Sequence, residues 1–535
     1  MADNDDMIRS SGAMVGATLT SRVLGMVREI CYARFMGDGL VAGAFVLAFM
    51  IPNLFRRLLG EGALSAAFIP VFKKQEKTKG EKAMWETANA LVSGLIVVLA
   101  GVVGVGLLVI FLALEWGGFG TKTTLILKLL GWMFPYMLLI CLTSVVMGML
   151  NARRHFFLPA LGAVILNVIM IGAVLVVGPT IHGAEKWWSG EKADLEQTIF
   201  VLAIAVLLAG GLQFLYQLPT LWREGFRPKW ISPLQNDSMR TILQRVGPGV
   251  IGAAAFQINV LATYCIGFFV GKHVVASYGY AVRLLELPQG LFSVSLATFL
   301  LPALAGYAAE KKYGEFRADI DQAARHLLFV NLPAAVLLFV MAEPIVKLLF
   351  EYGAFDEDAT GRAAWALRCL APALPGYSLV LILVRAFYAL GDVKTPVKIS
   401  IACLGLNLVL SLVLVFQFET DLRQGAFGIA NTISSTLNAA LLWSALRRRK
   451  ELAPVALPGL RRQLPMMVGF AGMAGLAAWG ISRGFDNEAE TLQERLILVF
   501  VPLLGAGSAY WAMSGLAGVD SAKAIFGILY RPRRK

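Results

Sequence analysis

The sequence has few charged residues for its length. Only 16% of its 535 residues are Asp, Glu, Lys or Arg, whereas 57% are hydrophobic. Soluble domains carry about 25% charged residues, which they need to cover their surfaces. The shortage, together with repeated apolar runs of about 20 residues, excludes soluble enzymes, secreted disulfide scaffolds and disordered chains. It predicts an integral membrane protein.

Cysteine and histidine are also scarce. The chain holds five cysteines and four histidines, all scattered. None of them has the spacing of a disulfide framework or a zinc site, so we expect the cysteines to be small apolar side chains inside helices. We therefore expect no metal centre built on these residues.

Catalytic motifs are absent as well. There is no aspartate-rich metal–diphosphate motif, no nucleotide-binding glycine loop, no Ser/His/Asp grouping and no HExxH. A membrane-bound polyprenyl-phosphate transferase or phosphatase would need catalytic Asp, His or metal ligands of that kind. We therefore predict that the protein is not an enzyme. A scaffold that recruits other proteins stays open, but it leaves the arginines described below unexplained.

Apolar segments long enough to cross a bilayer recur along the whole chain, and we predict fourteen transmembrane helices. Of the 48 Lys and Arg residues, 27 fall in the connections on the side of both termini and nine on the opposite side. By the positive-inside rule, both termini are predicted to be cytoplasmic. The net charge of +13 is therefore no sign of nucleic-acid binding. The predicted spans are 11–35, 41–70, 84–113, 123–150, 158–180, 197–221, 241–270, 274–306, 321–342, 363–388, 396–417, 425–446, 464–482 and 496–516.

The chain resembles itself at a constant offset in the sequence. Pro135 and Pro372 are separated by the same interval as Pro159 and Pro396. Units of six helices that start on the same side imply a parallel repeat. The predicted fold is therefore all-α and polytopic, with two six-helix lobes around a central cavity and two extra C-terminal helices. The predicted domains are an N-lobe over 1–225, a C-lobe over 240–450, spans 13 and 14 over 460–520, and a basic cytoplasmic tail over 521–535.

Twelve basic residues fall inside the predicted spans, and four of them carry the functional argument. A charge at the bilayer centre costs about 2.5–3.5 kcal/mol, so an arginine there must face water, a partner or a ligand. Residues near span ends are expected to reach the interface instead. A surplus of arginine in a cavity predicts an anionic ligand, and guanidinium groups match the oxygens of a diphosphate. The four residues are Arg22, Arg28, Arg56 and Arg283.

Carboxylates on the same helices offer these arginines partners when the ligand is absent. Glu29 follows Arg28 directly, Glu61 lies four residues after Arg57, and Glu286 lies three residues after Arg283. We predict that these glutamates and Arg57 act as cavity or gate partners. Pro52 predicts a kink in the second span, because proline lacks the backbone N–H that would bond one turn back.

At these residues the chain resembles the MurJ/MviN family, the lipid II flippases of bacterial peptidoglycan synthesis. The resemblance rests on SRVLGMVRE (21–29), IPNLFRRLLGEGALSAAFIPVF (51–72), GPGVIG (247–252), RLLELPQGLFSVSLATFLLPAL (283–304), LFEYGAF (349–355) and GDVKTPVKI (391–399).

The resemblance implies a fourteen-helix fold of the multidrug/oligosaccharidyl-lipid/polysaccharide exporter superfamily in the bacterial cytoplasmic membrane. It implies alternating access and lipid II, an undecaprenyl diphosphate-linked disaccharide-pentapeptide, as the substrate. By motif position, the essential arginines of the family correspond to the four named above. The resemblance also implies that spans 13 and 14, over 464–482 and 496–516, help to form a groove for the lipid tail. The chain has Gly43 and Val282 where the family often has Asp, which puts a carboxylate-based coupling step there in doubt.

Alternatives remain at this stage. Another exporter of the superfamily would move a different polyprenyl-linked oligosaccharide or a drug, although a pump for cationic drugs would want an acidic cavity. No cofactor is expected, and the energy source is left open between the membrane potential, sodium and protons. The resemblance gives only loosely compatible sodium ligands at Asn259, Asn407 and Thr432. Expected partners are lipid II, membrane lipids and cell-wall synthesis proteins, with no nucleic acid.

Overall fold

The computed structural model describes residues 2–60, 63–188, 191–233, 237–452, 457–485 and 491–523. No β-strand occurs among these residues, so the all-α prediction is confirmed. The chain divides into two compact units. Unit 1 comprises Met1–Phe268 and the short segment Tyr352–Phe355, and unit 2 comprises Phe269–Glu351 and Asp356–Lys535. The domain limits predicted from the sequence stay a prediction.

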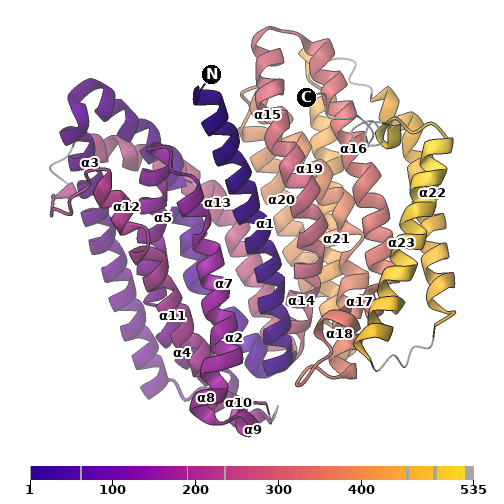
Figure 1. Cartoon of the computed structure of the whole chain (residues 1–535), viewed down its shortest axis with the longest axis horizontal. Helices are drawn as coiled ribbons and strands as arrows, with labels where there is room; N and C mark the ends of the chain where they lie inside the picture. Colours follow the sequence, from indigo (N-terminus) through magenta and orange to yellow (C-terminus); the bar gives the residue numbers. More distant parts are fainter. Residues whose placement is uncertain are drawn as a thin grey trace. The chain divides into compact units, whose positions relative to one another are not determined.

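Unit 1 contains the helices from α1 to most of α13, shown in indigo to magenta in Figure 1. Its elements are α1 (Ala2–Met36), α2 (Leu40–Phe55), η1 (Arg56–Gly60), α3 (Ala63–Trp116), α4 (Thr121–Met133), α5 (Tyr136–Ala152), α6 (Phe157–Ala160), α7 (Gly162–Gly172), η2 (Ala173–Val177), α8 (Gly178–His182), α9 (Ala184–Trp187), α10 (Lys192–Thr198), α11 (Phe200–Leu215), α12 (Leu218–Arg223) and α13 (Asp237–Val270).

Unit 2 contains the helices from α14 onward, shown in pink to yellow in Figure 1. Its elements are α14 (Val274–Pro288), η4 (Gln289–Ser293), α15 (Val294–Ala309), α16 (Tyr313–Val340), α17 (Ala342–Phe350), α18 (Glu357–Leu370), α19 (Ala373–Ala389), α20 (Lys394–Leu414), η5 (Thr420–Leu422), α21 (Gln424–Arg447), η6 (Lys450–Leu452), α22 (Pro458–Ser482) and α23 (Leu492–Leu516).

Among the described residues, nine helical segments are long and apolar enough to cross a membrane, and eleven if each of two bent helix pairs counts as one span. The other three predicted spans coincide with α1, α13 and α21. Helix α1 carries arginines and a glutamate in its middle, and α21 is rich in Asn, Ser and Thr, so neither meets a criterion based on hydropathy. The multi-pass membrane class is confirmed, and the count of fourteen stays a prediction.

The internal repeat is visible in the bends of the helices. The α4–α5 pair bends by 42° and the α18–α19 pair by 45°. The second helix of each pair begins directly after Pro135 or Pro372, the two prolines that occupy equivalent positions in the repeat. The repeated sequence therefore produces the same break at the same place in each unit.

A π-helical turn interrupts the corresponding helix of each unit. The turn η1 begins four residues after Pro52, and η4 directly follows Pro288. In unit 1 the π turn begins at Arg56, one helical turn after Pro52, and the kink expected at Pro52 stays a prediction. Such turns inside α-helices are frequent at functional sites.

The helix after η1 extends beyond the predicted end of the second span at residue 70. Helix α3 continues to Gly80, whose φ of 85° and ψ of 175° break it before it resumes toward Trp116. Glycine adopts this backbone conformation without a steric penalty, which explains the position of the break.

In unit 2, α22 and α23 pack against α16 and α17 (Figure 1). Arg495, at the start of α23, donates to the backbone oxygen and the carboxylate of Glu351 at 2.9 and 3.1 Å. Tyr510 donates to a backbone carbonyl of α16 at 2.8 Å. At the other end, Asp321 accepts the N–H of Leu460 at 3.0 Å. Hydrogen bonds at both ends and in the middle therefore hold α22 and α23 against the other helices of unit 2.

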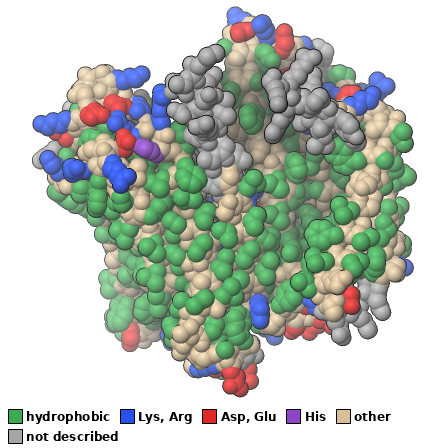
Figure 2. Space-filling model, in the orientation of Figure 1, with side chains coloured by type: hydrophobic (Ala, Val, Ile, Leu, Met, Phe, Trp, Pro, Cys, Tyr) green, Lys and Arg blue, Asp and Glu red, His purple; other side chains and the backbone are tan. Residues whose placement is uncertain are grey.

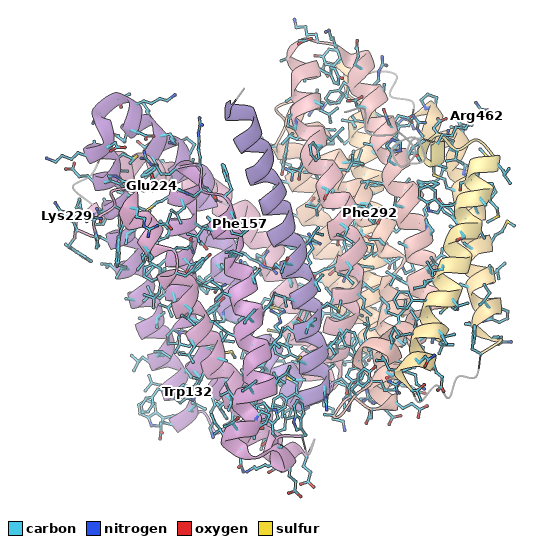
Figure 3. The ribbon with its side chains drawn as sticks, viewed as in Figure 1. Trp132, Phe157, Glu224, Lys229, Phe292 and Arg462 are labelled. Carbon is cyan, nitrogen blue, oxygen red and sulfur yellow. The ribbon has the colours of Figure 1, made fainter. Side chains whose placement is uncertain are left out.

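The side chains of unit 1 are distributed as in a membrane protein. On the left of Figure 2, hydrophobic side chains cover the middle of its visible face, and charged side chains gather at one end. Figure 3 places Glu224 and Lys229 at that end and Trp132, which is half exposed, at the opposite end. Tryptophan is enriched where a membrane meets water.

Candidate functional site

Arg28 is the most tightly held of the four candidate arginines. It lies on α1 with 13% of its side chain exposed, and its Nη2 is 2.6 Å from Oε1 of Glu29. Its Nη1 donates to Oδ1 of Asn167 at 3.0 Å, and its guanidinium carbon lies 5.5 Å from the centre of the Tyr32 ring. The buried Nε–H has no hydrogen-bond partner among the described residues. Asn167 and Glu29 therefore orient the Arg28 guanidinium, and its remaining N–H groups are left to donate to a ligand.

Asn167, on α7, is a positioning residue to which the sequence analysis gave no role. It is 4% exposed, and besides accepting from Arg28 it donates from Nδ2 to the backbone oxygen of Ser21 at 3.0 Å. Its amide thus contacts two points of α1 about two turns apart. The signal in the sequence was a lone amide in the apolar run VILNVIM, since a buried polar group needs a partner.

Arg22 and Arg56 also belong to unit 1. Arg22 lies on α1, partly buried, and has no hydrogen-bond or ion-pair partner among the residues that the structure describes. Arg56 is the first residue of the π turn η1, and its Nε donates to Oδ1 of Asn53 at 2.7 Å. The π turn therefore fixes where the Arg56 side chain leaves its helix.

Arg57 and Glu61 were predicted to form an i, i+4 pair. Glu61 lies outside the described residues, so the pair is not described. Arg57 is exposed, and its Nη1 is 3.5 Å from Oε1 of Gln257 on α13, at the limit of a hydrogen bond.

Arg283 is the candidate arginine of unit 2. It lies on α14 and pairs with Glu286 one turn later, at 2.9 Å between Nη1 and Oε2. The side chains are 43% and 50% exposed, so solvent screens this pair more than it screens Arg28 and Glu29.

The weak sodium candidates are separated between the units. Asn259 lies on α13 in unit 1, whereas Asn407 and Thr432 lie on α20 and α21 in unit 2. Asn407 donates from Nδ2 to Oγ of Ser434 at 3.1 Å, and Thr432 donates to the backbone oxygen of Cys369 at 3.0 Å. Both amino acids offer neutral oxygens, the ligand type that sodium uses. No group of three or more His, Cys, Asp or Glu side chains suited to a metal occurs in the described part of the chain.

The arrangement suits reversible anion binding. A guanidinium has five N–H donors in a fixed fork, and Arg28 uses one Nη1–H and one Nη2–H in the contacts above. A phosphate oxygen competes with Glu29 for the same donors, because both are anionic acceptors of similar geometry. A ligand of this kind can therefore be captured and later released without leaving Arg28 unpaired.

Comparison with known proteins places the chain in a family. The family model described as "Lipid II flippase MurJ" matches residues 32–500. The lipid II flippase MurJ of Burkholderia cenocepacia is 32% identical over 529 residues, which cover 97% of this chain and 98% of that protein. A probable lipid II flippase MurJ of Vibrio cholerae is 32% identical over 500 residues, covering 88% and 91%.

Solved structures agree on the fold. A lipid II flippase MurJ in an inward closed conformation has a TM-score of 0.77 at 20% identity and covers 95% of this chain and 99% of its own. An inward-facing multidrug transporter of the MATE family has a TM-score of 0.63 at 16% identity and covers 82% and 99%. The match of the family model over most of the sequence, and the relatives aligned from end to end, show that this chain belongs to the MurJ family of lipid II flippases.

Proposed function

We propose that this protein flips lipid II across the bacterial cytoplasmic membrane by alternating access. Arg22, Arg28, Arg56 and Arg283 bind the diphosphate in this proposal. The observation that carries it is Arg28: a nearly buried cation held by Asn167, paired with an adjacent carboxylate, and still able to donate. A cation in that position within an apolar helix bundle needs an anionic partner.

The glutamates supply the release step. When lipid II leaves, Glu29 and Glu286 pair with Arg28 and Arg283, the contacts that they make in this structure. Glu61 has the same role toward Arg57 in the proposal. The pairing removes the cost of leaving an unpaired cation and frees the protein to return empty.

The test is flipping of fluorescent lipid II by the purified protein in liposomes. Arg28→Ala should abolish flipping, and Arg28→Lys should leave a small residue of activity, because lysine keeps the charge but loses the forked geometry. Arg34→Gln is the matched control: Arg34 lies on the same helix but is exposed and stacks over Trp188 at 4.9 Å. Wild-type flipping by Arg28→Ala would sink the proposal. Flipping of another polyprenyl-linked oligosaccharide in preference to lipid II would favour the rival substrate class.

Membrane orientation and coupling belong to the same proposal. Both termini are cytoplasmic, which the Lys and Arg bias supports and reporter fusions at each end test. Return of the empty, positively charged protein is driven by the membrane potential, since one charge crossing 100 mV is worth about 2.3 kcal/mol. The competing source is sodium bound by Asn259, Asn407 and Thr432. A rate that follows an imposed potential in sodium-free buffer decides between them.

Two further roles complete the proposal. The segment 460–520 forms the groove for the lipid tail, which is supported by the apolar α22 and α23 and by their attachment to unit 2. Cell-wall synthesis proteins associate with the protein in the cell, a role implied by the family and tested by crosslinking in intact bacteria.

A further inference from the structure

The same backbone turn follows α5 in unit 1 and α19 in unit 2. The N–H of His155 donates to the carbonyl of Leu150 at 2.9 Å, and the N–H of Asp392 donates to the carbonyl of Phe387 at 3.0 Å. The residue before each donor has a positive φ, 67° in unit 1 and 76° in unit 2. The two donors are separated by the same interval as Pro135 and Pro372, and so are the two acceptors. The turn is therefore part of the repeat, and in each unit it ends a helix with a residue in the left-handed conformation.

An equivalent apolar core lies beneath each turn. The buried core of unit 1 includes five residues of α5, and for four of them the core of unit 2 includes the residue at the equivalent repeat position on α19. Each core also includes side chains around the end of the last helix of its repeat, Leu221 and Phe226 in unit 1 and Leu446 and Leu452 in unit 2. The eight equivalent residues are Val145, Val146, Met149 and Leu150, and Ile382, Leu383, Ala386 and Phe387.

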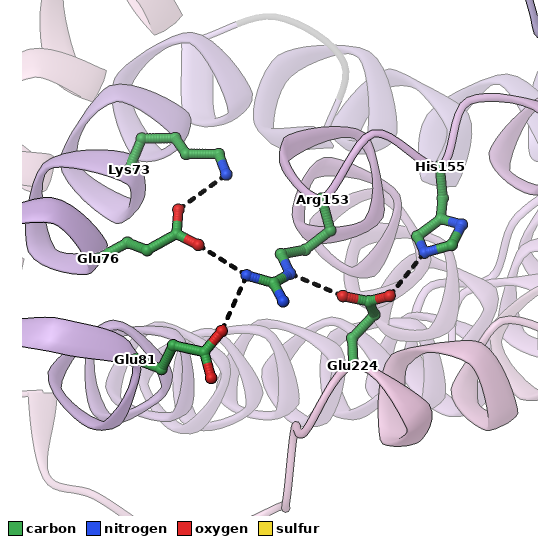
Figure 4. A network of polar contacts seen from close by, with 6 residues as sticks. All are labelled: Lys73, Glu76, Glu81, Arg153, His155 and Glu224. Carbon is green, nitrogen blue, oxygen red and sulfur yellow. Dashed lines mark hydrogen bonds and ion pairs between the residues drawn. The ribbon is translucent and has the colours of Figure 1, made fainter. Parts of the chain in front are cut away.

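In unit 1, charged side chains tie this turn to the segment after α12 (Figure 4). Glu224 accepts from Nε of Arg153 at 2.7 Å, and its other oxygen lies 2.8 Å from Nε2 of His155. Nη1 of Arg153 lies 2.6 Å from Glu76 and 3.2 Å from Glu81 on α3. The hydrogen bonds from His155 and Arg153 hold the pKa of Glu224 below its usual value.

In unit 2 the tie has the opposite polarity. Asp392 occupies the position of His155 and forms an ion pair with Arg449, which follows α21. The Arg449 guanidinium also lies 5.9 Å from the centre of the Phe387 ring. Asp392 accepts the N–H of Thr395 at 3.0 Å, so it caps the next helix as well. The turn is basic and the helix end acidic in unit 1, whereas the turn is acidic and the helix end basic in unit 2.

We propose that these two ties, Glu224 with Arg153 and His155, and Asp392 with Arg449, lock the turn of each unit to the end of the last helix of its repeat, α12 or α21, so that each unit moves as one body during transport. The same connection is made at the same place with reversed charges, which indicates that the mechanical link, and not the sign of the charge, is what the position requires. The proposal rests on the proposed flipping function. Except for His155 and Arg449, the tie residues are no more than 22% exposed, so solvent screens the pairs only in part.

A double-mutant cycle tests the tie of unit 2. Asp392→Asn removes the charge but keeps an oxygen for the N–H of Thr395, and Arg449→Gln removes the other partner. Each single variant should lower the flipping rate about tenfold, the size expected for one charged hydrogen bond, with lipid II binding unchanged. The double variant should be no slower than either single one, because the same interaction is lost once. Arg448→Gln, at an exposed neighbouring arginine, is the control that should flip normally.

Glu224→Gln tests unit 1, with the exposed Glu86→Gln on α3 as its control. Hydrogen–deuterium exchange of the turn amides is measured on every variant, and it should speed up only in the unit whose tie is broken. Wild-type flipping by both Glu224→Gln and Asp392→Asn overturns the transport role. If the unmutated protein flips no lipid II, the proposed function fails, and only the hydrogen–deuterium exchange of the turn amides then tests the ties. Unchanged exchange in both variants overturns the ties themselves.

Discussion

Replacing Asn167 with leucine removes the support of Arg28 while keeping the volume of the side chain. The change removes the 3.0 Å hydrogen bond to Nη1 of Arg28 and the 3.0 Å bond to the backbone oxygen of Ser21. A hydrogen bond to a charged group contributes about 1.5–3 kcal/mol and a neutral one about 1 kcal/mol. The Ser21 carbonyl also belongs to the helical backbone of α1, so the loss of its hydrogen bond from Asn167 costs an amount at the low end of this range. The sum is about 3 kcal/mol.

This energy should appear in substrate binding as well as in stability. A loss of about 3 kcal/mol corresponds to roughly 100-fold in an equilibrium constant. Arg28 then depends on Glu29 alone, which draws it toward the carboxylate and away from the ligand. We therefore expect lipid II affinity of Asn167→Leu to fall by about 10- to 100-fold, with the remainder seen as a lower unfolding temperature.

The assay is lipid II binding to the purified protein in detergent, beside thermal unfolding. Asn438→Leu is the control, because Asn438 is partly buried on α21 and donates to a neutral hydroxyl, that of Ser400, at 3.4 Å. It should change stability slightly and affinity not at all. Wild-type affinity in Asn167→Leu would refute the idea that Asn167 positions Arg28 for the ligand.

Three further predictions concern stability. Gly353→Ala should lower the unfolding temperature by several degrees, because Gly353 has a φ of 61° and an added Cβ would lie 2.6 Å from a backbone oxygen of α1, whereas Gly118→Ala, with a φ of 54° and open space, should lose only about 1 kcal/mol; equal losses would contradict this. Arg495→Gln removes the guanidinium that pairs with Glu351 at 3.1 Å and leaves this carboxylate the Thr360 hydroxyl at 2.7 Å and Lys347 at 3.9 Å, so it should cost about 2 kcal/mol in denaturant unfolding; an unchanged midpoint would show that the pair contributes nothing. Because the folded-state pKa of Glu224 is lowered, its stabilisation is present above the unfolded pKa and lost as pH falls through the folded pKa, so the difference in unfolding temperature between the wild type and Glu224→Gln should vanish in acid; a constant difference would contradict the linkage.

The fold was predictable because the lengths of the apolar segments and the spacing of the prolines can be read directly from the sequence. Pro135 and Pro372 marked the repeat in the sequence, and both lie at bends of similar angle. The helix α1 shows the limit of hydropathy, since Arg22, Arg28 and Glu29 lower its apolar character. The sequence nevertheless predicted a span over 11–35, and its charges gave that span a functional interpretation.

The candidate site was predictable in its residue types but not in its contacts. The pairing of Arg28 with Glu29 and of Arg283 with Glu286 follows from neighbours on one helix. The contact between Arg28 and Asn167 joins residues far apart in the sequence, so it depends on how α1 packs against α7. No helical periodicity encodes that packing.

The ties with reversed polarity show why a repeat in sequence underestimates a repeat in structure. His155 and Asp392 occupy equivalent positions in the two repeats, but they differ in charge, so a comparison of residue types does not match them. Their partners Glu224 and Arg449 are separated by a shorter interval, because the connections before them differ in length. The backbone turn is kept since its hydrogen bonds need only peptide groups, and each unit then supplies whichever charge pair its own helix ends allow. A tie of this kind becomes visible only when the backbone places its two ends together.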